Sequence, residues 1–312
     1  MKSKVIAPNS EFTFSVLQEE NNIRLDVFLA KQFSYSRSFF QKLISDEGIL
    51  INNALIKKPS YLIKANDEIV VKFPTQKEKR DIKTIEKDMG IEVLYEHPDF
   101  LIIYKPAGIL VHEVGSKKNE ITLVDWLLHK FKDLAQVGAS ERPGIVHRLD
   151  MLTSGLMIIP RNNFTHTLFG NMLKNRQIKK TYLAVVQGHP DESGTIEYGI
   201  LRHPSGYKMT YSKKYNSNAR EALTHYKVLK YLKDATLVEV HPITGRTHQI
   251  RVHFAAIGHP IIGDILYGKK SKLIERQALH SCCLEFEYEG EKFSFKKDMP
   301  EDMQKLVKSL TK

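Results

Sequence analysis

An acidic residue follows a basic pair in the segment GIVHRLDMLTSGLMIIP, residues 144–160. Arg148 and Asp150 lie two positions apart, and a Thr-Ser-Gly turn then leads into an apolar strand over Leu156–Ile159. An aspartate just before a turn usually bonds nearby backbone amides and is structural. At the rim of a packed sheet, however, burial disfavours the charged carboxylate unless a cation lies close. A carboxylate that stays ionised in such a pocket can act as a nucleophile or a base.

A helix that could supply this cation is predicted in HPITGRTHQIRVHFAAIGHP, residues 241–260. Thr247 is the expected N-cap, and Gly258 is the expected end of the helix. Ile250, Phe254 and Ile257 follow the i, i+4, i+7 spacing of one helix face, so this face is expected to pack on the core.

Arg251 and His248 lie three positions apart on a different face of the same helix. Arg251 could therefore project into a site and pair with Asp150, although an arginine on a helix of a basic protein is often simply solvated. His248 and His253 are poorly spaced for one metal ion, and no carboxylate completes a zinc set. We therefore expect no metal at this helix.

An aromatic side chain lies beside two lysines in the predicted strand IKKTYLAVVQG, where Tyr182 follows Lys179 and Lys180. An aromatic residue in a strand belongs to the core more often than to a catalytic site. In a nucleic-acid enzyme, however, the ring could stack on a base while the lysines contact phosphates.

The net charge of the chain indicates a polyanionic partner. Its 312 residues include 47 Lys and Arg against 36 Asp and Glu, a formal charge of +11. Nucleic acid is the first candidate partner, an anionic membrane surface is the second, and a merely soluble basic protein is the third possibility.

The two cysteines, Cys282 and Cys283, are adjacent and do not suit an ordinary disulfide, so we expect free thiols in a reducing compartment. No apolar stretch approaches the ~20 residues of a membrane span, and the N-terminus resembles no signal peptide. These features predict a cytoplasmic protein without a membrane anchor.

Composition divides the chain into four parts. Residues 1–21 show little periodicity and are expected to form an arm with a short strand at 12–17. Residues 22–74 predict a small module, residues 75–89 a charged linker, and residues 90–312 a larger domain.

The small module is predicted to contain two helices and a few strands. Ser36 is a plausible N-cap of the second helix, and Gly48 is its expected stop. Two short apolar runs about Asn52 and Asn53 then indicate a hairpin.

The larger domain is mostly strand-like, with helices too few for regular βαβ alternation. Thr122 and Asp125 have the spacing of a capping box ahead of one of its helices. The expected fold class is α+β, with a mixed and mostly antiparallel sheet.

Four segments resemble the RluA family of pseudouridine synthases, and they occur along the chain in the order expected for that family. The segments are HRLDMLTSGLMII (147–159), LIIYKPAGILVH (101–112), KKTYLAVVQGHP (179–190) and HPITGRTHQIRVHFAAIGHPIIGDILYG (241–268). The module over residues 22–74, with SRSFFQKLI and ILINNALIKKPS, is similar to the S4 RNA-binding domain. Together they most resemble the RluC and RluD type, which modifies large-subunit (23S) ribosomal RNA.

The resemblance implies roles for individual residues. It makes Asp150 the catalytic aspartate, and it makes Arg251 the basic residue that pairs with that carboxylate. Arg148 would enter the RNA helix where the base leaves, and Tyr182 would pack against the target base. RNA contacts are expected from further basic residues: Arg37 and Lys42 in the module, and Lys179, Lys180, Arg246 and His248 in the larger domain.

The reaction implied is the isomerisation of uridine to pseudouridine without a cofactor, on 23S ribosomal RNA or a ribosome-assembly intermediate, by a monomer. Transfer RNA is the alternative substrate. A non-catalytic RNA-binding protein of ribosome assembly is the second hypothesis, and the presence of Asp150, Tyr182 and Arg251 together argues against it. A hydrolase of glycosidic bonds is the third, and it would need a second carboxylate to activate water.

Overall fold

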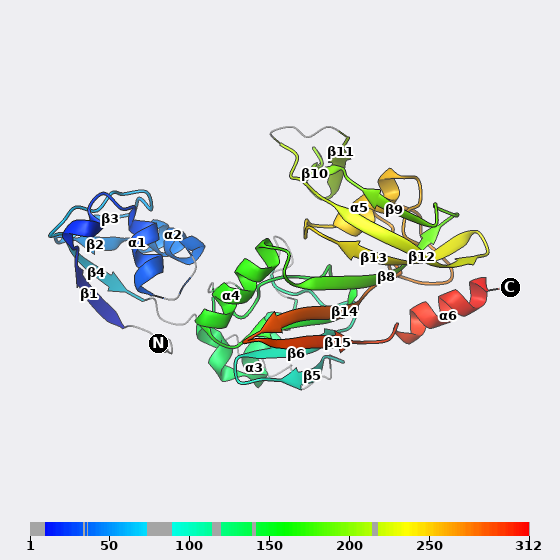
Figure 1. Cartoon of the computed structure of the whole chain (residues 1–312), viewed down its shortest axis with the longest axis horizontal. Helices are drawn as coiled ribbons and strands as arrows, with labels where there is room; N and C mark the ends of the chain where they lie inside the picture. The colour runs from blue at the N-terminus through cyan, green and yellow to red at the C-terminus, as the bar shows by residue number, and fades with distance from the viewer. Residues whose placement is uncertain are drawn as a thin grey trace.

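The computed structural model describes residues 10–33, 35, 37–73, 89–113, 120–138, 142–213 and 218–311. Figure 1 shows a small N-terminal module in shades of blue and a larger body that runs from cyan to red. Each part has its own buried apolar core. Within the described ranges, no helix is both long and apolar enough to cross a bilayer.

The larger body is built on one nine-stranded sheet with the order β5-β6-β7-β14-β8-β13-β12-β9, and β15 pairs with β14. Its strands are β5 (Glu92–Glu96), β6 (Phe100–Lys105), β7 (Ser154–Pro160), β8 (Lys179–Gln187), β9 (Ser193–Ile196), β12 (Thr224–Leu232), β13 (Ala235–Pro242), β14 (Leu279–Tyr288) and β15 (Glu291–Lys296). A separate ribbon pairs β10 (Gly199–Arg202) with β11 (Met209–Ser212). The helices are α3 (Leu123–Lys130), α4 (Asn163–Lys174), α5 (Gln249–Ala256) and α6 (Glu301–Leu310), and a 3₁₀ helix spans Lys132–Gln136.

The strands of this sheet are antiparallel except at one junction, where β7 and β14 run parallel. The predicted α+β class with a mostly antiparallel sheet is therefore confirmed. The capping box before α3 is also confirmed, because the Thr122 hydroxyl accepts from the amide of Asp125 while the Asp125 carboxylate accepts from the amide of Thr122.

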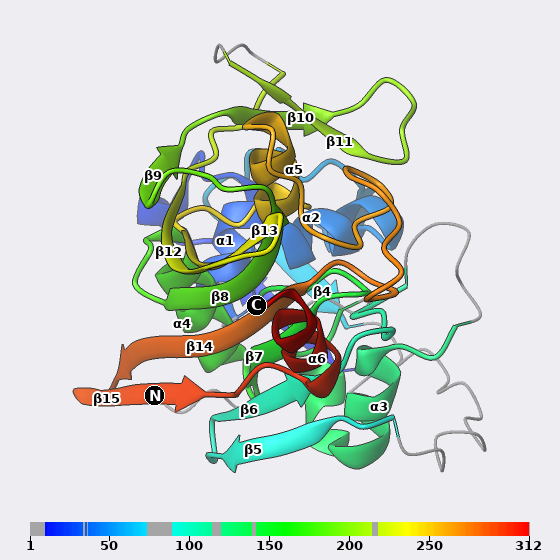
Figure 2. The ribbon, with the colours of Figure 1, turned by 90° about the vertical axis from the view of Figure 1, so that its right-hand side faces the viewer.

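Both faces of the central strands are covered. In β6, Phe100 and Ile102 belong to an apolar cluster with residues of α4 and β15, while Leu101 and Ile103 belong to one with residues of α3 and α6. Figure 2 shows α3 and α6 beside β6 on the second face. Because successive side chains of a strand point to opposite faces, double coverage requires an unbroken apolar run, as in FLII and GLMII.

A glycine permits the close approach of β7 to β14. A Cβ atom on Gly155 would lie 2.3 Å from the carbonyl oxygen of Ser281, and the φ of Gly155 is +132°. No other residue fits there without moving a strand. This contact fixes the start of β7, and with it the loop that carries Asp150.

The N-terminal module is a four-stranded antiparallel sheet, in the order β1-β4-β2-β3, covered by two helices. Its elements are β1 (Glu11–Ser15), a 3₁₀ helix (Gln18–Glu20), α1 (Leu25–Gln32), α2 (Arg37–Asp46), β2 (Ile49–Ile51), β3 (Ala54–Ile56) and β4 (Glu68–Lys72). The predicted hairpin about Asn52 and Asn53 is confirmed, and both residues have positive φ, as a tight hairpin turn requires.

The expected arm over residues 1–21 is too long, because β1 lies inside that range. Residues 11–15 pair along their whole length with β4 and complete the sheet of the module. The short strand had been predicted, but its partner is distant in sequence and could not be identified from local pattern. Ser36 and residues 75–88 of the predicted linker lie outside the described residues.

A buried carboxylate joins the two helices of the module. Asp26 of α1 has no exposed side-chain surface, and it accepts from Arg24 at 3.0 Å, from Arg37 at 2.9 Å and from Gln41 at 2.8 Å. Burial alone would raise the pKa of Asp26, but these hydrogen bonds and the charge of Arg37 outweigh it and hold the pKa well below its ordinary value. Asp26 therefore stabilises the module at neutral pH as an ion.

We expect Asp26→Asn to lower the free energy of unfolding of the module by roughly 3 kcal/mol at pH 7, because a buried, hydrogen-bonded ion loses its charge. Since the folded-state pKa is depressed, this stabilisation is fully present above the unfolded-state value of about 4 and fades as the pH falls below it. Far-UV circular dichroism of the full chain reports on both parts, whereas Trp126, the single tryptophan, reports on the larger body alone.

In Asp26→Asn, the part of the circular dichroism change that comes from the N-terminal module should move to a lower denaturant concentration. The Trp126 fluorescence transition should keep its midpoint. Asp46→Asn is the matched control, since Asp46 is exposed and lies 4.0 Å from Lys42; it should change stability by less than about 0.5 kcal/mol. Equal shifts in the two variants would contradict the structural role of Asp26.

Candidate active site

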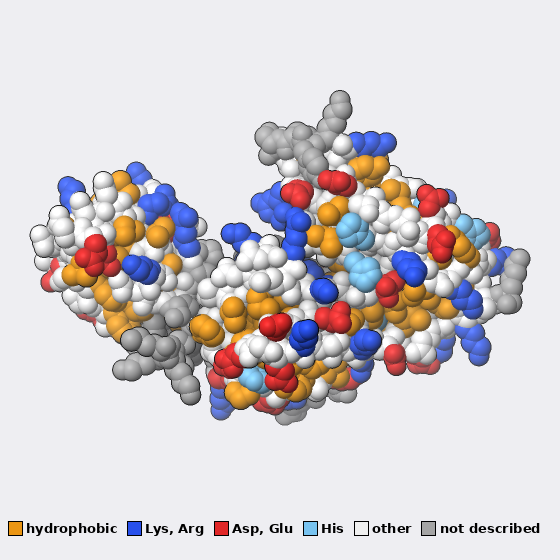
Figure 3. All heavy atoms as spheres, viewed as in Figure 1, with side chains coloured by type: hydrophobic (Ala, Val, Ile, Leu, Met, Phe, Trp, Pro, Cys, Tyr) orange, Lys and Arg blue, Asp and Glu red, His pale blue; other side chains and the backbone are white. Residues whose placement is uncertain are grey.

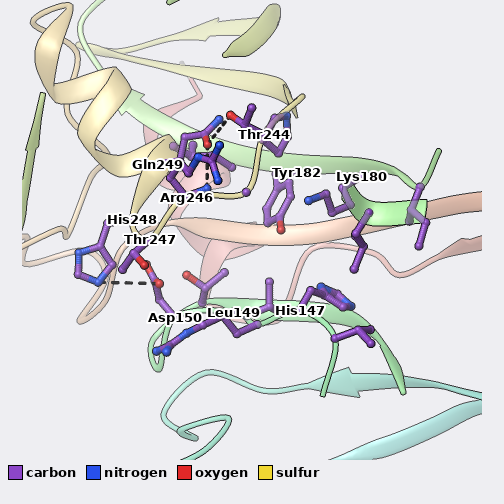
Figure 4. A pocket seen from close by; sticks show the side chains of 18 of the residues that line it. His147, Leu149, Asp150, Lys180, Tyr182, Thr244, Arg246, Thr247, His248 and Gln249 are labelled. Carbon is purple, nitrogen blue, oxygen red and sulfur yellow. Dashed lines mark hydrogen bonds and ion pairs between the residues drawn. The ribbon is translucent and has the colours of Figure 1, made fainter. Parts of the chain in front are cut away.

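A cavity of about 420 Å³ lies where the loop before β7, strand β8 and the N-terminal end of α5 meet. Figure 4 shows the side chains of Asp150, Tyr182, Lys180 and His248 around it. Other residues lining it are His112, Arg142, His147, Arg148, Arg176, Arg246 and Arg251. The cavity thus gathers many cationic and imidazole side chains around one carboxylate.

Asp150 presents its carboxylate to this cavity. Its backbone carbonyl accepts the amide of Thr153 at 3.0 Å, so main-chain atoms close the turn. Its side chain is 17% exposed, and Oδ2 accepts from Nη1 of Arg251 at 2.9 Å. The predicted pairing of Asp150 with Arg251 is confirmed. The Asp150 carboxylate is not needed to close the turn, because the backbone carbonyl accepts that hydrogen bond.

Arg251 is held in place by a second carboxylate, which the sequence analysis missed. Asp264 has no exposed side-chain surface, and its two oxygens accept from Nε and Nη2 of Arg251 at 2.7 and 2.9 Å. Burial lowers the pKa of Arg251, but the bonds and charges of Asp264 and Asp150 outweigh it and hold the pKa above its ordinary value. Because Nε and Nη2 of Arg251 both donate to Asp264, the guanidinium is oriented with Nη1 toward Asp150.

The start of α5 differs from the prediction. Thr247 is not the N-cap; that position belongs to His248, which adopts a left-handed conformation with φ of +57° and provides no side-chain cap. Gln249 closes the turn instead, because its Oε1 accepts from the hydroxyl of Thr244 and from the amide of Arg246. The predicted core face of the helix is confirmed by the burial of Ile250 and Phe254.

His248 lies between Tyr267 and Asp150, with one ring nitrogen toward each. Its Nδ1 lies 2.8 Å from the hydroxyl of Tyr267, and its Nε2 lies 3.9 Å from Oδ1 of Asp150. Burial lowers the pKa of His248, although the charge of Asp150 opposes the shift. The neutral imidazole is therefore the main form at neutral pH.

Tyr182 lies in β8 between β13 and β14, and its ring lines the cavity (Figure 4). The residue is 8% exposed, and burial raises the pKa of its hydroxyl to about 12. It is therefore a neutral phenol at physiological pH, with the flat ring directed at the space beside Asp150.

Strand alternation separates the two lysines before Tyr182. Lys180 shares the face of Tyr182 and lines the cavity, where burial lowers its pKa. Its Nζ would lie 3.5 Å from a Cβ atom on Gly245, so it crosses toward the loop before α5. Lys179 is exposed and does not line the cavity, so the structure does not bring it to the site.

Arg148 is exposed at the cavity, and its Nη1 lies 3.2 Å from Nε2 of His112. Burial, together with the charges of Arg148 and Arg142, lowers the pKa of His112 to about 4. His112 is therefore neutral and accepts from Arg148. His112 was not among the predicted site residues, because a lone histidine at the end of an apolar run carries no local signal.

A buried lysine supports the loop of Asp150. Lys105 has no exposed surface, and its Nζ donates to the carbonyl oxygens of Pro106, Ile109 and Met151 at 2.8, 3.1 and 3.1 Å. Burial lowers the pKa of Lys105 to about 7, although the charge of Asp150 opposes the shift. The three bonds tie the end of β6 to the residue that follows Asp150.

The remaining predicted RNA contacts lie at different distances from the cavity. Arg246 lines it, and its Nε donates to the carbonyl of Glu221. Arg37 and Lys42 lie on α2 of the N-terminal module, with about half of each side chain exposed. In the view of Figure 3, Lys and Arg side chains gather around the hollow between α4 and the β10–β11 ribbon.

A metal centre finds no support in the part of the chain that the structure describes. No group of three or more His, Cys, Asp and Glu side chains there is arranged to hold a metal ion. The described cavity presents a carboxylate, several guanidinium groups and a tyrosine.

Comparison with known proteins follows the same division into two parts. Residues 99–256 match the model of the RNA pseudouridylate synthase family, and residues 23–69 match that of the S4 domain. An RNA pseudouridine synthase of Aquifex aeolicus is 40% identical over 85% of this chain and 83% of its own length. The ribosomal large subunit pseudouridine synthase D of Zymomonas mobilis is 35% identical over 92% of this chain and 93% of its own length.

A solved structure of the human RNA pseudouridylate synthase domain containing 4 covers 70% of this chain and 92% of its own, with a TM-score of 0.56 and 25% identity. The solved fold and the curated relatives thus agree with the family match. The chain belongs to the RNA pseudouridine synthase family and carries an N-terminal S4 domain.

Proposed function

We propose that this enzyme converts specific uridines of large-subunit ribosomal RNA to pseudouridine, with Asp150 as the reacting carboxylate. The reaction breaks the N1–C1′ bond, rotates the uracil and joins C5 to C1′. It has no net redox change and consumes no water, so side chains alone can carry it. The observation that supports the proposal most directly is the Asp150 carboxylate at the cavity, paired with a guanidinium that Asp264 fixes from behind.

The target nucleotide has to leave its stack to reach Asp150, at a cost of roughly a few kcal/mol. The cavity of about 420 Å³ lies within the range of small-ligand pockets and offers the ring of Tyr182 as a stacking surface. Arg148 lies at the same cavity, where it could fill the gap that the base leaves in the RNA. Arg246, Lys180 and the module residues Arg37 and Lys42 would contact phosphates.

Two rival functions are less well supported. A hydrolase needs a second carboxylate that activates water, and Asp264 cannot do this because it is fully buried and both of its oxygens accept from Arg251. A non-catalytic binder would need neither the ordered Asp150–Arg251 pair nor Tyr182 in the cavity. Asp150, Tyr182 and Arg251 are together in one place, which favours an enzyme.

Large-subunit ribosomal RNA is favoured over transfer RNA because the Zymomonas mobilis relative is named for that substrate and because the S4 match covers most of the N-terminal module. A ribosome-assembly intermediate is the natural form of this substrate. This function would place the protein in the cytoplasm, and a monomer is sufficient for it, since the described cavity is built from one chain.

The proposal is tested by mapping pseudouridine in RNA from cells that lack the protein, complemented with wild type or Asp150→Ala. Sites in 23S RNA should vanish in the null strain and return only with wild type. In vitro, Asp150→Ala should lower the single-turnover rate at least ~10³-fold, because the reacting group is gone.

Asp133→Asn is the matched control, since Asp133 pairs with Arg161 at the surface and does not line the cavity. It should restore the marks as well as wild type. Marks that disappear from transfer RNA instead would reassign the substrate, and restoration by Asp150→Ala would leave the binder hypothesis in the lead.

Tyr182 is expected to act on the base mainly through its ring. Tyr182→Phe should keep the affinity for unmodified 23S RNA within about twofold, whereas Tyr182→Ala should weaken it roughly 5- to 100-fold through lost stacking. Filter binding at fixed salt measures both constants. Equal weakening in the two variants would show that the hydroxyl, rather than the ring, holds the RNA.

The S4 domain is expected to contribute affinity rather than rate. Lys42→Gln should raise KM a fewfold, leave kcat nearly intact and reduce the salt dependence of binding by about one charge. Lys305→Gln on α6 is the matched control, because this lysine is 72% exposed and does not line the cavity. A collapse of the single-turnover rate at saturating enzyme in Lys42→Gln would contradict the assignment.

A further inference from the structure

Tyr267, which was not among the predicted site residues, contacts both His248 and Arg251, the two residues that face the Asp150 carboxylate. Tyr267 lies in the loop after α5, its hydroxyl contacts Nδ1 of His248 at 2.8 Å, and its ring lies 5.1 Å from the guanidinium carbon of Arg251. The amide of Met209, at the start of β11, donates to the same hydroxyl at 2.9 Å. Tyr267 thereby connects the β10–β11 ribbon to the cavity.

These contacts favour one tautomer of His248. The hydroxyl of Tyr267 accepts from the amide of Met209, and Nδ1 of His248 lies 2.8 Å away as an acceptor for the hydroxyl proton. The neutral imidazole then carries its proton on Nε2, which faces Oδ1 of Asp150 at 3.9 Å. The opposite tautomer would leave the Tyr267 proton without an acceptor and would turn a lone pair toward a carboxylate.

The backbone of His248 is also held in an unusual conformation. Its φ of +57° lies in the left-handed region, which costs free energy in residues other than glycine. A helix cap does not explain it, because the side chain makes no capping bond and its polar contacts among the described residues are with Tyr267 and Asp150. The conformation directs the imidazole at the one oxygen of Asp150 that Arg251 does not hold.

We propose that His248, oriented by Tyr267, is a positioning residue for Asp150 in the pseudouridine synthase reaction. Arg251 alone fixes Oδ2 and leaves the carboxylate free to rotate about the Cβ–Cγ bond. His248 supplies a second donor on the other side, and a movement of roughly 1 Å brings Nε2 to hydrogen-bond distance of Oδ1. The pair thereby restricts the plane of the carboxylate when the nucleotide arrives.

This inference rests on the proposed function and changes the expected role of His248. A histidine that contacts phosphate would contribute to affinity, whereas a positioning residue contributes to the rate of the chemical step. The charges that surround His248 are those of Asp150, Arg251, Asp264 and Arg148. They act on a neutral imidazole, so the positioning role needs no change of protonation.

The test combines rates, affinities and a tautomer measurement on the full-length protein with in vitro transcribed 23S RNA. His248→Gly removes the side chain and relieves the left-handed backbone, so the fold is retained. Its single-turnover rate at saturating enzyme should fall roughly 30-fold or more, with the RNA Kd within about threefold of wild type. Release of tritium from C5 of labelled uridine gives the rate.

Tyr267→Phe keeps the ring beside Arg251 and removes only the hydroxyl. Its rate should fall roughly 5- to 10-fold, and the double variant should be no slower than His248→Gly, because Tyr267 acts through His248. Nitrogen-15 NMR of the imidazole should show the Nε2–H tautomer in wild type and a mixture in Tyr267→Phe. Tyr231→Phe, which removes a hydroxyl that donates to Pro190 far from the cavity, should leave rate and tautomer unchanged.

Three results would overturn the proposal. They are additive rate losses in the double variant, a weakened Kd with an intact saturating rate in His248→Gly, and an Nδ1–H tautomer in wild type. A failure of the proposed function looks different. In that case wild type itself releases no tritium from any RNA, while the tautomer of His248 still responds to Tyr267→Phe.

Discussion

The cavity depends on one series of charged contacts, in which the fully buried Asp264 carboxylate binds the Arg251 guanidinium and this guanidinium binds the Asp150 carboxylate. Asp264 satisfies two donors of Arg251, and the amides of Leu266 and Tyr267 also donate to it. These donors replace the water that a fully buried carboxylate lacks. Arg251 is thereby held on two of its nitrogens, and its Nη1 donates to Oδ2 of Asp150 at 2.9 Å. The loop after α5, the helix itself and the loop before β7 are all required for this one interaction.

Much of the fold and part of the site could be predicted from local sequence. The hairpin at Asn52 and Asn53, the capping box at Thr122 and Asp125, and the core face of α5 follow from short-range rules, and the structure confirms them. The apolar stripe of the helix placed Arg251 on a face that could reach a site, and the family resemblance implied its pairing with Asp150, which the structure shows.

What could not be predicted depends on contacts between segments that are remote in sequence. Asp264, Tyr267, His112 and Lys105 lie in loops or at a strand end, where no periodicity reveals their direction, and each acquires its role from a distant partner. The expected cap at Thr247 failed for a related reason, since Gln249 and Thr244 close the turn through their side chains and displace the ordinary cap. Strand β1 was predicted as a strand but not as part of the module, because its partner β4 lies more than fifty residues away.

The parallel junction between β7 and β14 has a consequence for the order in which the protein is made. The ribosome completes the Asp150 loop and β7 well before β14, the strand that Gly155 contacts so closely. Until β14 emerges, β7 has an open edge on that side, and Arg251 and Asp264 are synthesised in the interval. A nascent chain therefore lacks a fixed Asp150 loop until its last strands are translated. The sheet around the Asp150 loop is completed late in synthesis, when β14 pairs with both β7 and β8.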